Sequence, residues 1–385
     1  MKQIELVLQN DGVKRTIIFP CTEAEYQAVR KELALKDNYA FVIDVIEPKA
    51  LALKKDMFVN LDELNYLAKR MDSFDQKELF SFFAAIETGD YVSTKDLINL
   101  TFNLNCYTLI RDVSNLKSVG RNYVLCREVA ISVDELEKTD LEKIGRELLS
   151  TGKGIPTNYG LLFRNEDVVF AEVYKGKGFP PYYYTGGEVL GVEIEKDGEK
   201  DYIYFPCEKT EIERALKRIG AGDISECSKR IDFCGGDEEW EDYFNDLLQK
   251  NDIESVNAIS SAINRLGATE DAISENLYKL SAVMEFAGVT AADTEKVIRL
   301  AGCLDEFEYY REIGNDYNLG TKLIENEIGA AAEKINDYID YEKYAQDFLE
   351  ENGGAYTKYG DVVYLRDDQS LSEILGENEI KMGGI

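Results

Sequence analysis

Regularly spaced carboxylates are the side chains of this sequence best placed to do chemistry at a surface. In the segment DEEWEDYFNDLLQK, Glu238, Asp242 and Asp246 recur every four residues, while Trp240 and Phe244 fall on the opposite side of the helix that this spacing predicts. Residues four apart on a helix have Cβ atoms about 5–6 Å apart. This separation approaches the roughly 7 Å between successive phosphates along a DNA strand. The pattern therefore predicts a helix face that imitates one side of a nucleic acid.

Three further groups of acids follow toward the C-terminus. The first lies in the segment LDEFEYYREIG, the second in the segment after it, and the third around the segment NDYIDYEKYAQDFLEE. The residues of these groups that we expect to bind a partner are Asp305, Glu306, Glu308, Glu312, Asp316, Glu325, Glu327, Asp337, Asp340, Glu342 and Asp347.

The negative charge is concentrated in the C-terminal half. Residues 1–186 contain 28 acidic and 24 basic side chains, a net charge of −4, whereas residues 187–385 contain 46 acidic and 20 basic side chains, a net charge of −26. A net charge of about 2 to 8 is enough to keep a small domain soluble, and like charges oppose the compact state. The size and lopsidedness of the charge therefore favour a functional role over solubility alone.

Several classes of catalysis lack the residues that they require. The sequence has no histidine, which excludes Ser-His-Asp triads, Cys-His pairs and histidine-bound metals. It also has no glycine-rich phosphate loop, no dinucleotide loop and no EF-hand pattern. Paired carboxylates can support glycoside hydrolysis or bind magnesium, but among 74 acids such pairs arise by chance. We expect a non-enzymatic protein without catalytic residues, cofactor or metal, and a carboxylate-based hydrolase is the less favoured alternative.

The cysteines and the apolar segments indicate the compartment. Seven cysteines at wide spacings, without a Cys-x-x-Cys pair, are typical of reduced thiols packed in a core. The sequence has no run of 18 apolar residues and no N-terminal segment of signal-peptide composition. We expect a cytoplasmic protein that does not associate with a membrane.

An internal repeat organises the chain and positions these carboxylates. The phrase Phe-Pro-Cys occurs at residues 19–21 and again at residues 205–207, each time after an alternating apolar segment. From this offset of 186 the spacing of the matches grows to 192 and then to 200. The matched pairs include Asp11 and Asp197, Gly12 and Gly198, Asn65 and Asn257, Arg111 and Arg311, Gly120 and Gly320, and Tyr159 and Tyr359. Because the matches keep their order, we interpret the chain as a tandem duplication.

Each copy is predicted to belong to the α+β class. We expect a β-hairpin and helix, then a helical middle subdomain, then a C-terminal αβ subdomain, in an elongated molecule. The apolar residues of the helical middle recur at helical spacing, at Leu64, Leu67 and Met71 in one copy and at Val256, Ile259 and Ile263 in the other. The first unit is expected over residues 1–175 and is nearly neutral, and the second is expected over residues 188–385 and is strongly acidic. Residues 176–187, rich in glycine and proline, are the expected linker.

The C-terminal segment YIDYEKYAQDFLEENGGAYTKYGDVVYL, the segment DYNLGTKLIENEIG before it and the segment LDELNYLAKRM of the first copy resemble the ArdA antirestriction proteins of conjugative elements. The most specific part is the phrase Tyr-Ile-Asp-Tyr-Glu-x-Tyr. The resemblance is clearest over residues 292–365 and 56–115 and implies two tandem ArdA-like units. Within the second unit it assigns the mimic surface to Tyr338, Asp340, Glu342 and Asp347.

Members of this family are non-enzymatic DNA mimics that occupy the DNA-binding groove of type I restriction-modification enzymes, and many are homodimers. The resemblance implies an anti-defence inhibitor from a mobile genetic element that binds a protein with a basic groove, does not bind nucleic acid directly and can form a homodimer. The near-neutral first copy departs from the acidic family pattern, and we expect it to dock on protein or to replace a dimer partner within the same chain. Alternatives are inhibition of another nuclease or defence complex, such as a CRISPR system, and an acidic scaffold whose charge only keeps it soluble.

Overall fold

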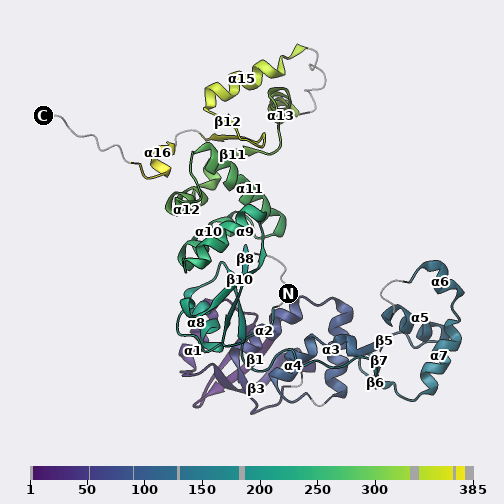
Figure 1. The fold of residues 1–385 in the computed structure, drawn as a ribbon. Coiled ribbons are helices and arrows are strands. Elements are labelled where there is room, and N and C mark those ends of the chain that lie inside the picture. Colours follow the sequence, from purple (N-terminus) through teal and green to yellow (C-terminus); the bar gives the residue numbers. More distant parts are fainter. Residues whose placement is uncertain are drawn as a thin grey trace. The chain divides into compact units, whose positions relative to one another are not determined.

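The computed structural model divides into two compact units, and both are of the α+β class (Figure 1). Unit 1 comprises Met1–Tyr184 with Glu199–Asp201, and unit 2 comprises Thr185–Gly198 with Tyr202–Ile385. The structure describes residues 3–51, 53–89, 91–127, 131–181, 187–329, 338–366 and 370–377. Each unit contains two small sheets joined by helices.

A β-hairpin with an Asp-Gly turn opens unit 1, as the sequence predicts. The first sheet consists of β1 (Ile4–Asn10), β2 (Val13–Phe19), β3 (Tyr39–Glu47) and β4 (Phe58–Asn60), in the order β2-β1-β3-β4. Asp11 and Gly12 have φ values of 46° and 85°, the left-handed region that a two-residue hairpin turn requires. After the hairpin, Thr22 and Glu25 form a capping box that begins α1 (Glu23–Glu32).

Three helices follow this sheet and bury the predicted apolar stripe. They are α2 (Leu61–Asp72), α3 (Gln76–Thr88) and α4 (Thr94–Thr101), and a short 3-10 turn, η1 (Lys49–Leu51), precedes them. Leu64, Leu67 and Met71 of α2 are buried, which confirms them as core residues. They belong to a hydrophobic cluster that also contains the inward side chains of β1.

A second sheet and a pair of packed helices complete unit 1. The elements are η2 (Leu104–Cys106), β5 (Tyr107–Ile110), α5 (Leu116–Arg127), α6 (Val133–Lys138), α7 (Leu141–Ser150), β6 (Ile155–Thr157) and β7 (Gly160–Arg164), with strand order β5-β7-β6. The helices α5 and α7 approach so closely at Gly120 that an added Cβ would lie 1.9 Å from the carbonyl oxygen of Leu141. Only glycine permits this contact.

The first part of the expected linker is instead packed on unit 1. Phe179 is buried and stacks on Tyr66 of α2 and on Tyr174, with ring centroids 4.5 Å and 5.2 Å away. The hydroxyl of Tyr66 donates to the carbonyl oxygen of Pro180 over 2.8 Å. Phe179 of this segment therefore contributes to the core, which the glycine and proline content of the segment did not predict.

Unit 2 opens in the same way. Its first sheet consists of β8 (Leu190–Lys196), β9 (Glu199–Phe205) and β10 (Ser228–Cys234) in the order β10-β8-β9, with α8 (Lys209–Arg218) and η3 (Ile224–Glu226) between β9 and β10. Asp197 and Gly198 form the predicted turn, with φ values of 52° and 82°.

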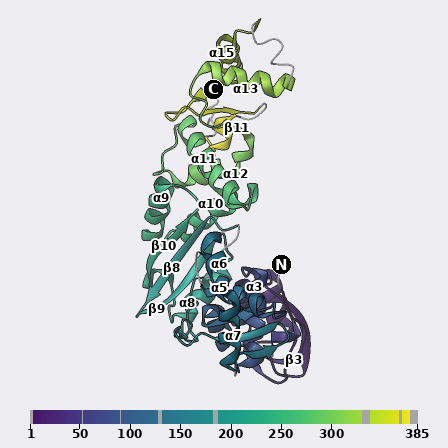
Figure 2. The same ribbon diagram turned by 90° about the vertical axis from the view of Figure 1, so that its right-hand side faces the viewer.

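Four helices of unit 2 lie between its two sheets (Figure 2). They are α9 (Glu238–Gln249), α10 (Ile253–Leu266), α11 (Glu270–Phe286) and α12 (Thr294–Gly302). Val256, Ile259 and Ile263 of α10 are fully buried, which confirms the second predicted stripe. In the described part of the chain no helix is both long and apolar enough to cross a membrane.

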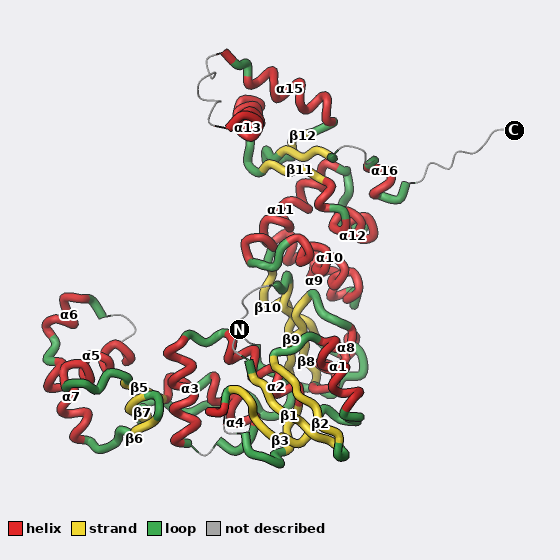
Figure 3. Tube along the Cα trace, turned by 180° about the vertical axis from the view of Figure 1, so that it is seen from behind, coloured by secondary structure: helices red, strands yellow, loops and turns green. Residues whose placement is uncertain are grey.

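The second sheet of unit 2 supports another helix pair. The elements are η4 (Leu304–Glu306), β11 (Phe307–Tyr310), α13 (Asp316–Ile328), α15 (Tyr341–Asn352), β12 (Ala355–Tyr356), β13 (Val362–Leu365) and α16 (Leu371–Ile374), with strand order β11-β13-β12. The helices α13 and α15 lie near β11 and β12 (Figure 3) and pack on each other. An added Cβ at Gly320 would lie 2.0 Å from the carbonyl oxygen of Tyr341.

One polar contact recurs in both units. The backbone N–H of Cys21 donates to the Oδ1 atom of Asn65 over 3.0 Å, and the backbone N–H of Cys207 donates to the Oδ1 atom of Asn257 over 2.9 Å. Each asparagine thus joins the end of a hairpin to a helix further along its unit, α2 in unit 1 and α10 in unit 2.

The prediction that all cysteines are core thiols is wrong for one of them. Cys106 and Cys227 are buried, but Cys126 is exposed on α5. It follows Leu125, also exposed, on the outer face of a short helix that buries only Val119, Gly120 and Val124.

Candidate functional site

The helix α9 carries the predicted line of carboxylates. Glu238, Asp242 and Asp246 are exposed, while Trp240 and Phe244 are buried on the opposite side. Asp246 forms an ion pair with Lys250, at 2.5 Å between the charged atoms. Within the described residues, no ion pair neutralises Glu238 or Asp242. The N-terminal end of α9 therefore presents uncompensated negative charge.

This acidic helix belongs to unit 2 alone. In unit 2 the chain passes from β10 through α9 to α10, whereas in unit 1 it passes from β3 through η1 and β4 to α2. The charge of α9 therefore accompanies an element that the first unit replaces by a strand.

The acids around β11 are partly neutralised by neighbouring arginines. Their exposed or half-buried carboxylates are Asp305, Glu306, Glu308 and Glu312. Arg265 lies 3.7 Å from Asp305, Arg366 lies 2.6 Å from Glu308, and Arg311 lies 3.4 Å from Glu312. These pairings make the group a weaker candidate for partner binding than α9.

The helix pair α13 and α15 brings together most of the remaining candidates. Its exposed acids include the predicted residues Glu325, Glu327, Asp340, Glu342 and Asp347, and also Glu350 and Glu351, which were not among the predicted residues. Tyr338, which the resemblance places on the surface, is exposed, and Asp337 lies outside the described residues. The structure thus places these exposed acids on two helices that pack on each other.

Three of the predicted acids on the helices α13 and α15 also have structural roles. Asp316 is half-buried and accepts hydrogen bonds from Gln346 over 2.7 Å and from the hydroxyl of Tyr356 over 2.9 Å. Asp340 caps α15 by accepting from the backbone N–H of Lys343, and Glu327 accepts from the hydroxyl of Tyr344 over 2.8 Å. Burial raises the pKa of Tyr356, and its hydrogen bond to Asp316 raises it further, so the phenol remains the donor.

The corresponding helix pair of unit 1 is nearly neutral. Residues 116–152 contain seven acids and six bases, whereas residues 316–352 contain ten acids and three bases. In α7, Arg146 pairs with Glu142 over 2.9 Å. The residue 200 positions later is Gln346, which carries no charge. The two helix pairs share their closest contact but differ in charge.

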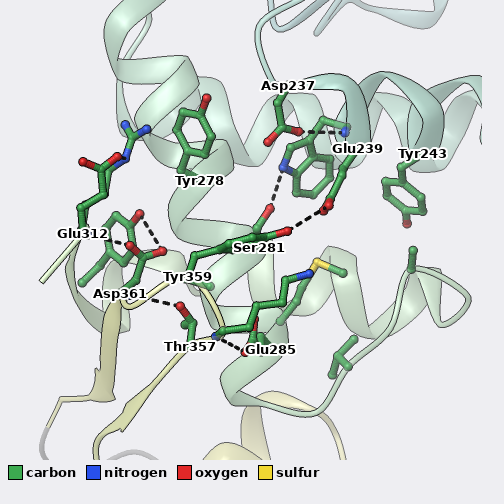
Figure 4. Close-up of a pocket in the computed structure, with 18 residues that line it drawn as sticks. Asp237, Glu239, Tyr243, Tyr278, Ser281, Glu285, Glu312, Thr357, Tyr359 and Asp361 are labelled. Atoms are coloured by element: carbon green, nitrogen blue, oxygen red, sulfur yellow. Dashed lines mark hydrogen bonds and ion pairs between the residues drawn. The ribbon is translucent and has the colours of Figure 1, made fainter. Parts of the chain in front are cut away.

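A cleft of about 840 Å³ lies in unit 2 next to α9, and the sequence did not predict it (Figure 4). It is bordered by α9, α11, β11 and the turn before β13. Its lining includes the aromatic residues Trp240, Tyr243, Tyr278, Tyr309 and Tyr359, the acids Asp237, Glu239, Glu285, Glu312 and Asp361, and the bases Arg311 and Lys358. The cleft therefore combines aromatic rings with an excess of carboxylates.

The described residues contain no group of three or more Cys, Asp or Glu side chains arranged to hold a metal ion. A scan against protein-family models and a search of curated proteins give no match to this chain.

Proposed function

We propose that this chain is a non-enzymatic inhibitor that mimics DNA. In this proposal, the carboxylates of α9 and of the α13/α15 pair occupy the DNA-binding groove of a type I restriction-modification enzyme. The groove of such an enzyme is basic because it binds phosphates. A protein surface with ordered, unneutralised carboxylates is complementary to it, and the long-range attraction speeds association.

The observation that carries this proposal is the charge difference between the two helix pairs. Both pairs close on a glycine at the same position, Gly120 or Gly320, against a carbonyl oxygen of the facing helix. Apart from Asp316, Glu327 and Asp340, which accept hydrogen bonds within the unit, the packing therefore does not require the acids of α13 and α15. The remaining acids repel one another and contribute nothing to the packing. A partner that binds them best explains their presence.

We also propose that the two units descend from a tandem duplication of one ArdA-like unit. Support comes from the common Asp-Gly hairpin turns, from the equivalent bonds of Asn65 and Asn257, and from the equivalent glycine contacts. In this view the near-neutral unit 1 contributes a protein-docking surface or replaces a dimer partner, and unit 2 carries the mimic.

Binding to a purified type I restriction-modification enzyme tests the function. We expect a stoichiometric complex, measured by calorimetry, that duplex DNA displaces. Because the attraction is between charges, raising the salt concentration to about 300 mM should weaken it strongly. A complex that forms equally well in the presence of saturating duplex DNA, or whose affinity is independent of salt, would contradict mimicry.

A different DNA-binding nuclease or defence complex is the alternative target, because carboxylates complement any basic groove. Capture of partners from a host lysate, with duplex DNA as competitor, separates the two targets. Recovery of a DNA-displaceable nuclease other than a type I enzyme would keep the mimicry and change the target.

A further inference from the structure

The turn that borders the cleft of unit 2 has a counterpart in unit 1 that packs on aromatic side chains. In unit 1, Tyr159 packs on Phe80 and Phe83 of α3, with ring centroids 5.8 Å and 5.7 Å away. The same turn is fixed by the backbone N–H of Asn158, which donates to Glu87 over 3.0 Å. The turn at Asn158 and Tyr159 is therefore packed against aromatic side chains of α3.

The turn of unit 2 docks in the same way but over a smaller side chain. The backbone N–H of Lys358 donates to Glu285 over 2.6 Å, as Asn158 does to Glu87. Counting back along α11 from Glu285, as along α3 from Glu87, places Ser281 where unit 1 has Phe83. Ser281 lines the cleft and accepts from the indole N–H of Trp240 over 2.9 Å, and Tyr359 is 64% exposed beside it.

Glu312 pairs with Arg311 over 3.4 Å, whereas the other four carboxylates of the cleft accept hydrogen bonds from neutral donors. Glu239 accepts from the hydroxyl of Tyr359 over 3.2 Å, and Glu285 accepts from a backbone N–H. Asp361 accepts from the backbone N–H of Glu312 over 2.7 Å, and Asp237 accepts from that of Trp240 over 3.2 Å. Figure 4 shows these residues around the cleft. Five carboxylates against two bases in the lining favour a cationic occupant.

The aromatic side chains of the cleft favour a planar cation that can stack on a ring. The guanidinium of Arg311 already lies 4.0 Å from the ring centroid of Tyr278, so the lining accommodates a stacked guanidinium. Tyr243 also lines the cleft, and its buried hydroxyl has no hydrogen-bond partner among the described residues. A planar group with several N–H donors can stack on a ring while it donates to a carboxylate and to a hydroxyl.

We propose that this cleft binds the guanidinium group of an arginine side chain presented by the bound protein. The identity of that protein rests on the function proposed above, because a groove that binds DNA presents arginines. The affinity for guanidinium depends only on the cleft. The acidic helices then provide the long-range attraction, and the cleft fixes the position of the complex.

Trp240 is the only tryptophan of the chain and lines the cleft, so its fluorescence reports occupancy directly. We would titrate the full-length protein with N-acetyl-Gly-Arg-Gly-amide and, as the neutral control, with the same peptide containing citrulline, at matched ionic strength. A saturable change with the arginine peptide and none with citrulline is expected. A flat response to the arginine peptide, or equal responses to both peptides, would overturn the proposal.

Two variants locate the site. Ser281→Phe introduces the residue that unit 1 has at this position, Phe83, and should abolish the saturable change in fluorescence. Glu239→Gln removes one carboxylate of the cleft and should weaken binding by about two- to fivefold, the range of an exposed charge pair. Glu241→Gln, at an exposed position of the same helix but outside the lining, is the matched control and should bind like the parent protein.

Equal affinities of the Glu239→Gln and Glu241→Gln variants would overturn the assignment, and this comparison decides the matter if Ser281→Phe does not fold. The titration contains no restriction enzyme and no DNA. A failure of the DNA-mimic function would therefore leave a saturable arginine response unchanged, and a flat response would leave the DNA competition result unchanged.

Discussion

The helix pairs α5/α7 and α13/α15 have the same closest contact, but the first pair is nearly neutral and the second is acidic. In each pair a glycine of the first helix touches a carbonyl oxygen at the start of the second. Around this contact the first pair balances its charges and the second pair accumulates acids. The packing of the helices requires the glycine. It leaves the surface charge free to change.

The largest expected effect of a substitution is at the shared glycines. Gly320→Ala would force a methyl group to within 2.0 Å of the carbonyl oxygen of Tyr341, and Gly120→Ala would do the same at Leu141. Backbone atoms on both sides cannot move away easily, so each change should destabilise its helix pair by about 3 kcal/mol. Hydrogen exchange of the two helices measures the loss.

Gly302→Ala is the control for both changes, because an added Cβ there meets no atom within 4 Å. It should leave the exchange of its helix unchanged or slower. Fast exchange in only one of the two helix pairs would show that their contacts are not equivalent.

A smaller effect is expected at the asparagines that brace the hairpins. Asn65→Ala and Asn257→Ala each remove the acceptor of a cysteine backbone N–H that is not fully exposed. Each should cost about 1 kcal/mol, the net contribution of one hydrogen bond. The amides of Cys21 and Cys207 should lose their protection from hydrogen exchange. Asn245→Ala, at an exposed position of α9, is the control, and a comparable cost there would reject the bracing role.

The smallest effect is expected at the surface ion pair that distinguishes the two helices. Arg146→Gln gives α7 the uncharged residue that α15 has as Gln346. Arg146 and Glu142 are both well exposed, so the loss in the free energy of unfolding should be at most about 0.5 kcal/mol. Urea unfolding followed by circular dichroism measures it, and a loss above about 1 kcal/mol would mean that the charge differences also affect packing.

The elements that depend on local spacing were predictable from the sequence. The Asp-Gly turns, the amphipathic helix α9 and the buried stripes of α2 and α10 follow from residue types two to four positions apart. The exposure of Glu238 and Asp242 follows from the same periodicity. These predictions succeed because each depends on contacts within one helix or one hairpin.

Features that depend on distant residues were not predictable in this way. The cleft is lined by Ser281, where unit 1 has Phe83, and by a turn more than 70 residues later that docks beside it. The sequence signal was that Ser281 replaces Phe83. Recognising it requires the spacing between matched residues of the two copies, which lies between 192 and 200 in this region. Likewise, Asp316 was predicted as a surface acid, but it accepts a hydrogen bond from the hydroxyl of Tyr356, which is distant in the sequence.

The central claim, that the acids of the second helix pair bind the partner, can be tested by exchanging charges between the two pairs. One variant introduces into unit 2 the arginines of unit 1, by Thr321→Arg, Glu327→Arg and Gln346→Arg. The matched variant makes the reverse changes in unit 1, Arg121→Thr, Arg127→Glu and Arg146→Gln. Each changes the net charge by the same amount in opposite directions, at positions where the other unit already carries the new residue.

The measurement is the dissociation constant of each variant with the type I restriction-modification enzyme. The account predicts that the unit 2 variant binds about tenfold more weakly or worse, while the unit 1 variant binds at least as well as the parent protein. Unchanged affinity of the unit 2 variant would contradict the claim that these helices imitate DNA.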